Sequence, residues 1–262
     1  MGRFSDRVFG STFLVTLGLA VIMCIVVVAS PLLHVELREL AEAISSRRVL
    51  LALSLSLLTS TISTIICMVI AVPSAYVLSR YSVPGKNVIT TLLSLPIVLP
   101  PVAIGASLLM FFANTSIGEL IQRVIRIIFE VPGIIVAQTV VITPLAIWAL
   151  RATFDGIDPK YEDVAKTLGL SNFSIFFKIV LPMAKSGLLS AVVLAWARAM
   201  GEFGASIMLA GATPMKTETL PIAIYLALAG ADIPKACAVI LILIATSFIA
   251  LIAIQKGAQR IS

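Results

Sequence analysis

The sequence predicts an all-α integral membrane protein, and three observations lead to this prediction. Hydrophobic residues make up 60% of the 262 residues, whereas charged residues make up only 12%. A soluble domain carries roughly twice that share of charge. Apolar runs of about 20 residues, the length that a helix needs to cross a bilayer, recur along the chain. With a mean hydropathy of +1.10, we expect a single membrane domain over residues 1–262.

Six apolar runs account for the predicted transmembrane helices. The first is too long for the apolar core of a signal peptide, and the proline in Ala29-Ser30-Pro31 is awkwardly placed for cleavage, so we interpret it as a span. The second is long enough to tilt or to extend beyond the bilayer. The runs lie near Gly10–Leu33, Val49–Leu78, Val88–Phe112, Pro132–Leu150, Ser186–Ala210 and Ile233–Ile254.

The basic residues between these runs predict the orientation in the membrane. One side would carry eleven basic residues against five acidic ones, while seven of each cancel on the other side. An excess of Lys and Arg marks the cytoplasmic side, so both termini and the loop between the fourth and fifth runs should be cytoplasmic. The pI of about 9.5 then needs no nucleic acid to explain it. The basic residues are Arg3, Arg7, Arg80, Lys86, Arg151, Lys160, Lys166, Lys178, Lys185, Lys256 and Arg260, and the acidic ones are Asp6, Asp155, Asp158, Glu162 and Asp163.

Three prolines and a glycine interrupt the third run: Pro96, Pro100, Pro101 and Gly105. Prolines break the regular hydrogen-bond ladder, and in lipid the freed carbonyl groups must face protein or a water-filled cavity. One proline alone indicates a kink that shapes helix packing. A cluster of three favours a transport pathway or a moving gate, because discontinuous helices are typical of transport sites.

The fifth run contains a pair of opposite charges, Arg198 and Glu202, four residues apart and therefore expected on one helical face near the middle of the span. Each charge alone would cost about 2.5–3.5 kcal/mol at the centre of a membrane helix, and pairing lowers that penalty. The pair either fixes helix packing or lies in the pathway. Gly201, Gly204 and Ala205 should let another helix approach closely at the same level.

The cytoplasmic loop between the fourth and fifth runs contains a patterned short helix. Asp158 and Pro159 are typical of a helix start, and Gly169 is a natural stop. Glu162 and Asp163 place negative charge in the first turns, which suits the helix dipole. Such a helix either lies on the membrane surface or docks a soluble partner. Its apolar stripe comprises Tyr161, Val164, Ala165 and Leu168, and its polar face Lys160, Glu162, Lys166 and Thr167.

Nothing in the chain indicates an enzyme. There is no phosphate-binding loop for ATP, since the glycine frame that would precede Lys86 is missing. Cys24, Cys67 and Cys237 fall inside spans and are expected to be small buried apolar residues, with no metal or disulfide pattern. His34 sits at a membrane edge. We therefore expect a transport subunit without catalytic residues, cofactor or metal, driven by a separate ATPase if ATP drives it.

The cytoplasmic loop resembles the EAA–G–I–LP loop by which permeases of ABC importers engage their ATPase. Asp163 stands where that family usually has Glu, and Val164 and Ala165 stand at the two Ala positions; Gly169, Ile179, Leu181 and Pro182 match in register. The runs that begin at Leu95 and at Ala197 resemble the permeases of molybdate, tungstate and sulfate importers, a branch of the type I ABC importer family. This resemblance covers the chain from the second run onward.

The resemblance implies a type I importer permease fold with a cytoplasmic coupling helix, in which a five-helix core at about 49–256 follows an added first helix at about 10–33. It implies a second permease subunit, most simply an identical one, two ATPase subunits, an external binding protein, and location in the cell membrane as a multi-pass protein. The coupling residues would be Pro159, Tyr161, Glu162, Asp163, Val164, Ala165, Leu168 and Gly169, and the pathway or gate candidates Pro96, Pro100, Pro101, Gly105, Arg198, Gly201, Glu202 and Gly204.

The expected cargo is a tetrahedral oxyanion, with molybdate or tungstate ahead of sulfate, thiosulfate or another small solute. Two other protein classes fit less well. An ATP-independent secondary transporter should show inverted repeats and several ionisable residues within the membrane, whereas only Arg198 and Glu202 are found. A membrane-embedded enzyme should gather catalytic residues near one interface, and no such set is present.

Overall fold

The described part of the chain is built from helices alone, which confirms the predicted all-α fold. The computed structural model describes residues 2–259, and side chains over residues 12–256. Arg260 lies outside the described residues, as do the side chains of Arg3, Asp6 and Arg7, so their part in the predicted charge asymmetry stays a prediction. The helices are α1 Gly2–Ala29, the 3₁₀ turn η1 Ser30–Leu33, α2 Leu37–Ser45, α3 Arg47–Arg80, α4 Lys86–Val98, α5 Pro101–Asn114, α6 Ser116–Val124, α7 Val131–Asp155, α8 Lys160–Thr167, α9 Asn172–Ile175, the π-helical turn η2 Phe176–Val180, α10 Leu181–Met183, α11 Lys185–Met200, α12 Gly204–Ala210, α13 Leu220–Ala229 and α14 Ile233–Gln259.

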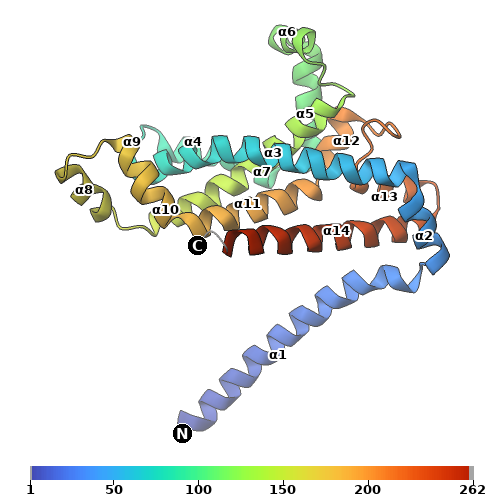
Figure 1. Ribbon diagram of the computed structural model, residues 1–262, viewed down its shortest axis with the longest axis horizontal. Coiled ribbons are helices and arrows are strands. Elements are labelled where there is room, and N and C mark those ends of the chain that lie inside the picture. Colours follow the sequence, from blue (N-terminus) through green and yellow to red (C-terminus); the bar gives the residue numbers. More distant parts are fainter. Residues whose placement is uncertain (1, 260–262) are drawn as a thin grey trace.

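Within residues 2–259, four helices are long and apolar enough to cross a membrane, and the number rises to six if each of two bent helix pairs is one span. The four single helices are α1, α3, α7 and α14; the last three contain the second, fourth and sixth predicted runs, and the first run extends from α1 into η1. The bent pairs are α4 with α5, at 109°, and the segment from α9 to α10 with α11, at 74°. Figure 1 shows α3, α7, α11 and α14 running side by side along the bundle.

Small residues allow α3, α7 and α11 to pack closely against one another. In lipid, helix association depends on packing rather than on the hydrophobic effect, so small side chains gather at the contacts. The fully buried small residues include Cys67, Ala71 and Ala75 of α3, Ala146 of α7, and Ala191 and Ala195 of α11.

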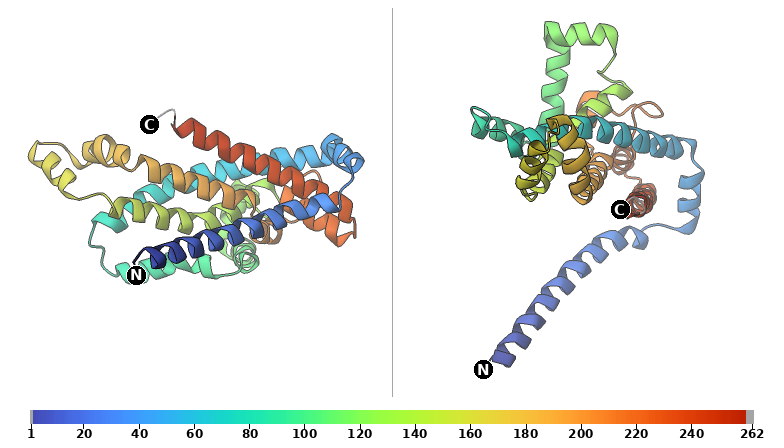
Figure 2. Two further views of the ribbon diagram at one scale, coloured as in Figure 1. Left: turned by 90° about the horizontal axis from the view of Figure 1, so that it is seen from below. Right: turned by 60° about the vertical axis from the view of Figure 1, so that its left-hand side comes forward.

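The first helix stands apart from the bundle, as Figures 1 and 2 show. Among residues 12–33, Pro31 of η1 is the one buried residue, where the segment meets α14. The expectation that Cys24 is buried is therefore wrong for the single chain, whereas Cys67 and Cys237 are buried. A helix that is apolar all round must be covered by lipid or by another subunit.

The third span breaks where its prolines stand. Helix α4 ends at Val98, Leu99 and Pro100 leave the helix, and α5 begins with Pro101 as its first residue. Proline is suited to this first position, because the missing N–H would have no helical acceptor there. Pro96 remains inside α4. The bend of 109° at this break turns α5 away from the bundle axis, and Figure 1 shows α5 and α6 projecting from it.

The fifth span differs from the prediction of one helix over residues 186–210. Helix α11 ends at Met200, residues 201–203 leave the helix, and α12 begins at Gly204. Arg198 therefore lies in the last turn of α11 and Glu202 lies beyond its end, so the two do not share one helical face as predicted. The reason is local: the Glu202 carboxylate accepts a hydrogen bond from Ala205 N at 2.8 Å and stabilises the start of a new helix.

Candidate functional site

The predicted cytoplasmic helix forms α8, at one end of the bundle beside α9 (Figure 1). Helix α8 begins at Lys160, with Pro159 rather than Asp158 at the N-cap, so the predicted start is one residue early; Asp158 accepts a hydrogen bond from Lys160 N at 2.9 Å. Gly169 adopts φ +82°. Leu170 N donates to Ala165 O at 3.1 Å and Gly169 N donates to Lys166 O at 2.9 Å. These two bonds form a Schellman motif, which favours glycine at this position.

The predicted apolar stripe of α8 divides into an exposed part and a buried part. Tyr161, Val164 and Leu168 face outward, with Leu168 74% exposed. Ala165 is only 3% exposed and packs into the core cluster that joins α3, α7 and α11. We call Tyr161, Val164 and Leu168 the apolar face of α8. The chain itself leaves this face uncovered at the tip of the molecule.

The two acidic residues of α8 have different environments. Asp163 is exposed and pairs with Lys166 at 3.1 Å. Glu162 is buried, with its side chain only 6% exposed. Tyr76 Oη donates to Glu162 at 2.7 Å, and Arg80 Nε donates to the same carboxylate. Sequence reasoning treated Glu162 as a dipole charge and missed its partners. The spacing of Tyr76 and Arg80, four residues apart at the end of a long helix, is the signal that could have found them.

Two features surround this end of the bundle. A cavity of about 450 Å³ lies beside the contact between the end of α3 and α8, lined by Tyr76, Arg80, Tyr81, Glu162, Lys166 and Asn172 among others. Beside α8, the rings of Phe173 and Phe177 are exposed, and their centroids lie 4.5 Å apart. Phe177 belongs to the π-helical turn η2, and single π-helical turns are frequent at functional sites. The exposed apolar surface at this end therefore extends from α8 onto α9 and η2.

The two broken spans, predicted separately as pathway segments, contact each other through α5 and α12. A Cβ atom added to Gly105 would lie 2.6 Å from Ala205 O and 2.7 Å from Ala205 Cα, and one added to Gly204 would lie 3.0 Å from Val102 N. Only glycine fits at such distances from a backbone. Gly201 differs, because its added Cβ would have no neighbour nearer than Ala197 O at 3.8 Å. The close approach expected at Gly201 is not found within this chain.

The ion pair at the break is formed by Arg198 Nη1 and Glu202 Oε2, 2.7 Å apart, with the Glu202 side chain only 1% exposed. A further buried residue, which sequence reasoning did not identify, satisfies the end of α11: Gln138 of α7 donates from Nε2 to Ala199 O at 3.0 Å. The Gln138 amide oxygen accepts from Ser63 Oγ of α3 at 2.9 Å. The break thus joins α3, α7, α11 and α12 through polar contacts.

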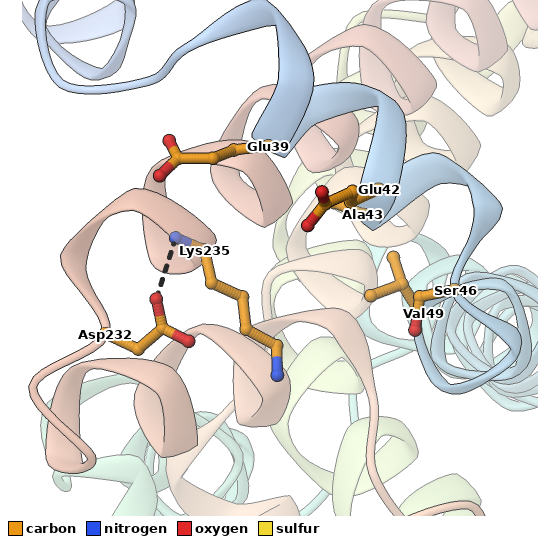
Figure 3. Close-up of a pocket in the computed structure, with 7 residues that line it drawn as sticks. All are labelled: Glu39, Glu42, Ala43, Ser46, Val49, Asp232 and Lys235. Carbon is orange, nitrogen blue, oxygen red and sulfur yellow. Dashed lines mark hydrogen bonds between the residues drawn. The ribbon is translucent and has the colours of Figure 1, made fainter.

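The opposite end of the bundle carries an acidic pocket of about 380 Å³ between α2 and the start of α14 (Figure 3). Glu39, Glu42 and Asp232 line it together with Lys235, whose backbone N donates to Asp232 Oδ1 at 3.2 Å. The described residues contain no cluster of His, Cys, Asp and Glu that could hold a metal ion. The two ends of the bundle therefore differ: one carries this pocket, and the other carries exposed apolar side chains on short helices.

Comparison with known proteins decides the family. Residues 67–262 match the family described as binding-protein-dependent transport system inner membrane component. The chain belongs to this family. Permeases of this family are transport components, so the chain is a membrane transport subunit and not an enzyme. The predicted resemblance to ABC importer permeases is confirmed.

Three similar proteins place this permease among its relatives. It is 37% identical to a probable molybdenum ABC transporter permease protein of Haloferax volcanii, over 79% of this chain and 74% of the relative. It is 30% identical to the sulfate transport system permease protein CysT of Escherichia coli (strain K12), over 95% of this chain and 93% of the relative. A bacterial ABC transporter involved in the import of the acidic polysaccharide alginate shares its fold, with a TM-score of 0.76 and 15% identity over 99% of both chains.

Replacing Gly105 with alanine should destabilise the permease, because the new Cβ would collide with the backbone of Ala205. Overpacking of a tight contact typically lowers the free energy of unfolding by about 1–3 kcal/mol. Gly201→Ala is the matched control, since its Cβ has room and the loss of glycine flexibility in the unfolded chain should be neutral or slightly stabilising. Thermal unfolding of both purified variants in one detergent measures the difference. Equal midpoints would contradict the tight α5–α12 contact.

Proposed function

We propose that this permease is the membrane subunit of an ATP-driven importer that carries a tetrahedral oxyanion, molybdate or tungstate. The names of its relatives support the oxyanion class, and the molybdenum permease has the higher identity. Sulfate, thiosulfate or another small solute is the alternative. It is supported by the greater coverage of the sulfate permease, which aligns with 95% of this chain, whereas the molybdenum permease aligns with 79%. An external binding protein delivers the solute.

The apolar face of α8 is the observation that carries the coupling role. Tyr161, Val164 and Leu168 are exposed on a helix whose end is fixed by a Schellman motif, and the chain provides nothing to cover them. The permease has no ATP-binding motif of its own. We propose that the segment from Pro159 to Gly169, which contains α8, inserts into a groove on an ATPase subunit, which hydrolyses the ATP. Asp163 and Lys166, exposed beside that face, lie at the rim of the same contact.

The proposed assembly contains two permeases, most simply identical, and two ATPases. One chain offers one α8, and ATPases of this class work in pairs, so a symmetric dimer is the simplest closed arrangement. The described ends of the chain, Gly2 and Gln259, lie toward the α8 end of the bundle in Figure 1. This agrees with the positive-inside prediction that both termini and α8 are cytoplasmic. The acidic pocket at α2 would then face the external binding protein.

We place the pathway and its gate along α5 and α12, between the break at Leu99 and Pro100 and the break after Met200. The backbone is interrupted at both places, as it is in many transport sites. The pair of Arg198 and Glu202 serves the packing of this region in our proposal, because Glu202 is buried and also caps α12. Because Glu202 neutralises Arg198, the pair would not bind each passing anion too tightly.

Replacing Leu168 with arginine should release the ATPase from the permease. The charge would enter the apolar face of α8, where binding requires it to lose water. Thr167→Arg on the polar side of α8 is the matched control and should leave the complex intact. Co-purification of the ATPase with each tagged permease variant measures the result. Full retention of the ATPase by the Leu168 variant would contradict docking through this face. Ala165 is a poorer probe, because it is buried in the permease core.

Uptake of labelled molybdate by cells carrying the complete transporter should be blocked by excess unlabelled tungstate, and not by the same excess of sulfate. Molybdate and tungstate are similar in size and charge, whereas sulfate is smaller.

Uptake should also stop when cellular ATP is depleted while the membrane potential is maintained. Cells that lack the permease provide the background. Blockage by sulfate alone would select the sulfate alternative, and uptake that persists without ATP would select a secondary transporter.

Changing Arg198 and Glu202 together to glutamine should leave transport within about twofold of the unmodified protein. The double change removes both charges at once, so neither is left unpaired, and glutamine at residue 202 still offers an acceptor to Ala205 N. A reversal of the two charges would be a weaker test, because arginine at residue 202 cannot accept that bond. Transport into proteoliposomes and thermal stability are measured side by side. Lost transport in a stable, assembled complex would instead place Arg198 in the pathway.

A further inference from the structure

Arg80, the last residue of α3, holds three segments together at the α8 end of the bundle. Its Nε donates to Glu162 of α8, and its Nη2 donates to Ile157 O in the loop before α8 at 2.8 Å. Its Nη1 donates to Ser79 Oγ at 3.2 Å, and Ser79 Oγ donates to Asp155 at the end of α7. Only 10% of the Arg80 side chain is exposed. Each of the three guanidinium nitrogens therefore donates a hydrogen bond within the chain.

Tyr76, one turn earlier on α3, completes the hold on Glu162. Its hydroxyl donates to Glu162 Oε2, whereas Arg80 binds Oε1, so both carboxylate oxygens are held by α3. The Tyr76 ring packs against Phe154 and Phe176, with centroids 5.7 Å and 4.8 Å away. Glu162 thus faces the opposite way from the apolar face of α8. It is satisfied inside the permease and has no oxygen free for an ATPase.

Few other contacts fix α8 to the rest of the permease. It touches its neighbours α9 and η2, and beyond these Ala165 and Glu162 are its buried residues. A buried carboxylate that loses its partners is strongly unfavourable, so α8 cannot move far from the end of α3 while Glu162 stays buried. The two helices must move together or the contact must break.

At its other end, α3 is held by a similar pair. Arg48 donates to Glu218 from Nε and from Nη2, each at 2.7 Å, a bidentate geometry in which the Glu218 side chain is only 2% exposed. Glu218 belongs to the loop between α12 and α13. One helix of 34 residues therefore links α8 to a loop at the far end of the bundle through an Arg–Glu pair at each end.

We propose that Tyr76 and Arg80 are positioning residues for energy coupling: they lock Glu162 to α3, so that a displacement of α8 by the ATPase moves α3 and the α12–α13 loop. This inference rests on the proposed docking of α8 and goes beyond it. Docking uses the outward face of α8, whereas transmission uses its inward face. The two roles can therefore be separated by mutation.

The test uses the full complex of permease, ATPase and binding protein in proteoliposomes, with solute uptake and ATP hydrolysis measured together. Glu162→Gln and Tyr76→Phe should keep the ATPase bound, because the apolar face of α8 is unchanged. Solute transported per ATP should fall roughly tenfold for Glu162→Gln, which loses a charge-assisted bond, and less for Tyr76→Phe, which loses one hydroxyl. Glu119→Gln is the matched control, since Glu119 is an exposed carboxylate in the first turn of α6, away from α8 and from the acidic pocket.

A charge reversal separates positioning from general stability. Arg80→Glu alone should uncouple the complex, and Arg80→Glu with Glu162→Arg should recover part of the transport per ATP. Tyr76→Phe keeps the ring packing, so it remains informative if a charge variant fails to accumulate. Unchanged transport per ATP in Glu162→Gln and Tyr76→Phe would overturn the inference while leaving docking intact, provided that Leu168→Arg still releases the ATPase. Release of the ATPase by Glu162→Gln would also overturn it.

Discussion

The hydrocarbon core of a bilayer offers no hydrogen bonds to the backbone, and this constraint decides where the helices of this permease can break. Each interruption needs partners from the chain itself. Gln138 donates to Ala199 O where α11 ends, Glu202 accepts from Ala205 N where α12 begins, and Ser56 accepts from Leu220 N at 2.8 Å where α13 begins. These contacts come from α3, from α7 and from the broken segment itself. The irregular region is therefore built into the bundle rather than added to its surface.

The same constraint explains why polar residues and glycines occur together in this region. A carbonyl or amide freed by a break can be satisfied only if another element comes close, and close approach requires small residues. Gly105 and Gly204 bring α5 against α12, and α3 presents a buried polar face toward the neighbouring helices. That face consists of Ser56, Thr59, Ser60, Ser63 and Thr64. An apolar α3 would leave Gln138 without its hydroxyl donor and Leu220 N without its acceptor.

The sequence predicted the features that depend on local chemistry and missed those that depend on distant contacts. Long apolar runs located α1, α3, α7 and α14, and prolines located the break between α4 and α5, because both signals act within a few residues. The break after Met200 was missed; Glu202 stabilises it locally, and Gln138 of another helix binds Ala199 O there, a contact that the local sequence pattern could not show. Helix α13 was missed because its ten apolar residues are too few for a span. The helical pattern of α8 likewise could not show that Glu162 is buried and Val164 exposed.

The Arg–Glu pairs of this permease differ in what they can contribute. Arg38 and Glu42 are exposed, and such pairs contribute about 0–1 kcal/mol. In the pairs Arg80–Glu162 and Arg48–Glu218 the carboxylate is buried, so removing its partner leaves an uncompensated charge at a cost of about 3–5 kcal/mol. A well-packed apolar contact could give similar stability. An apolar contact would, however, allow the two elements to slide against each other. A carboxylate whose two oxygens are both hydrogen-bonded fixes their relative position. These buried pairs therefore fix the geometry at the two ends of α3, which the proposed transmission of movement through this helix requires.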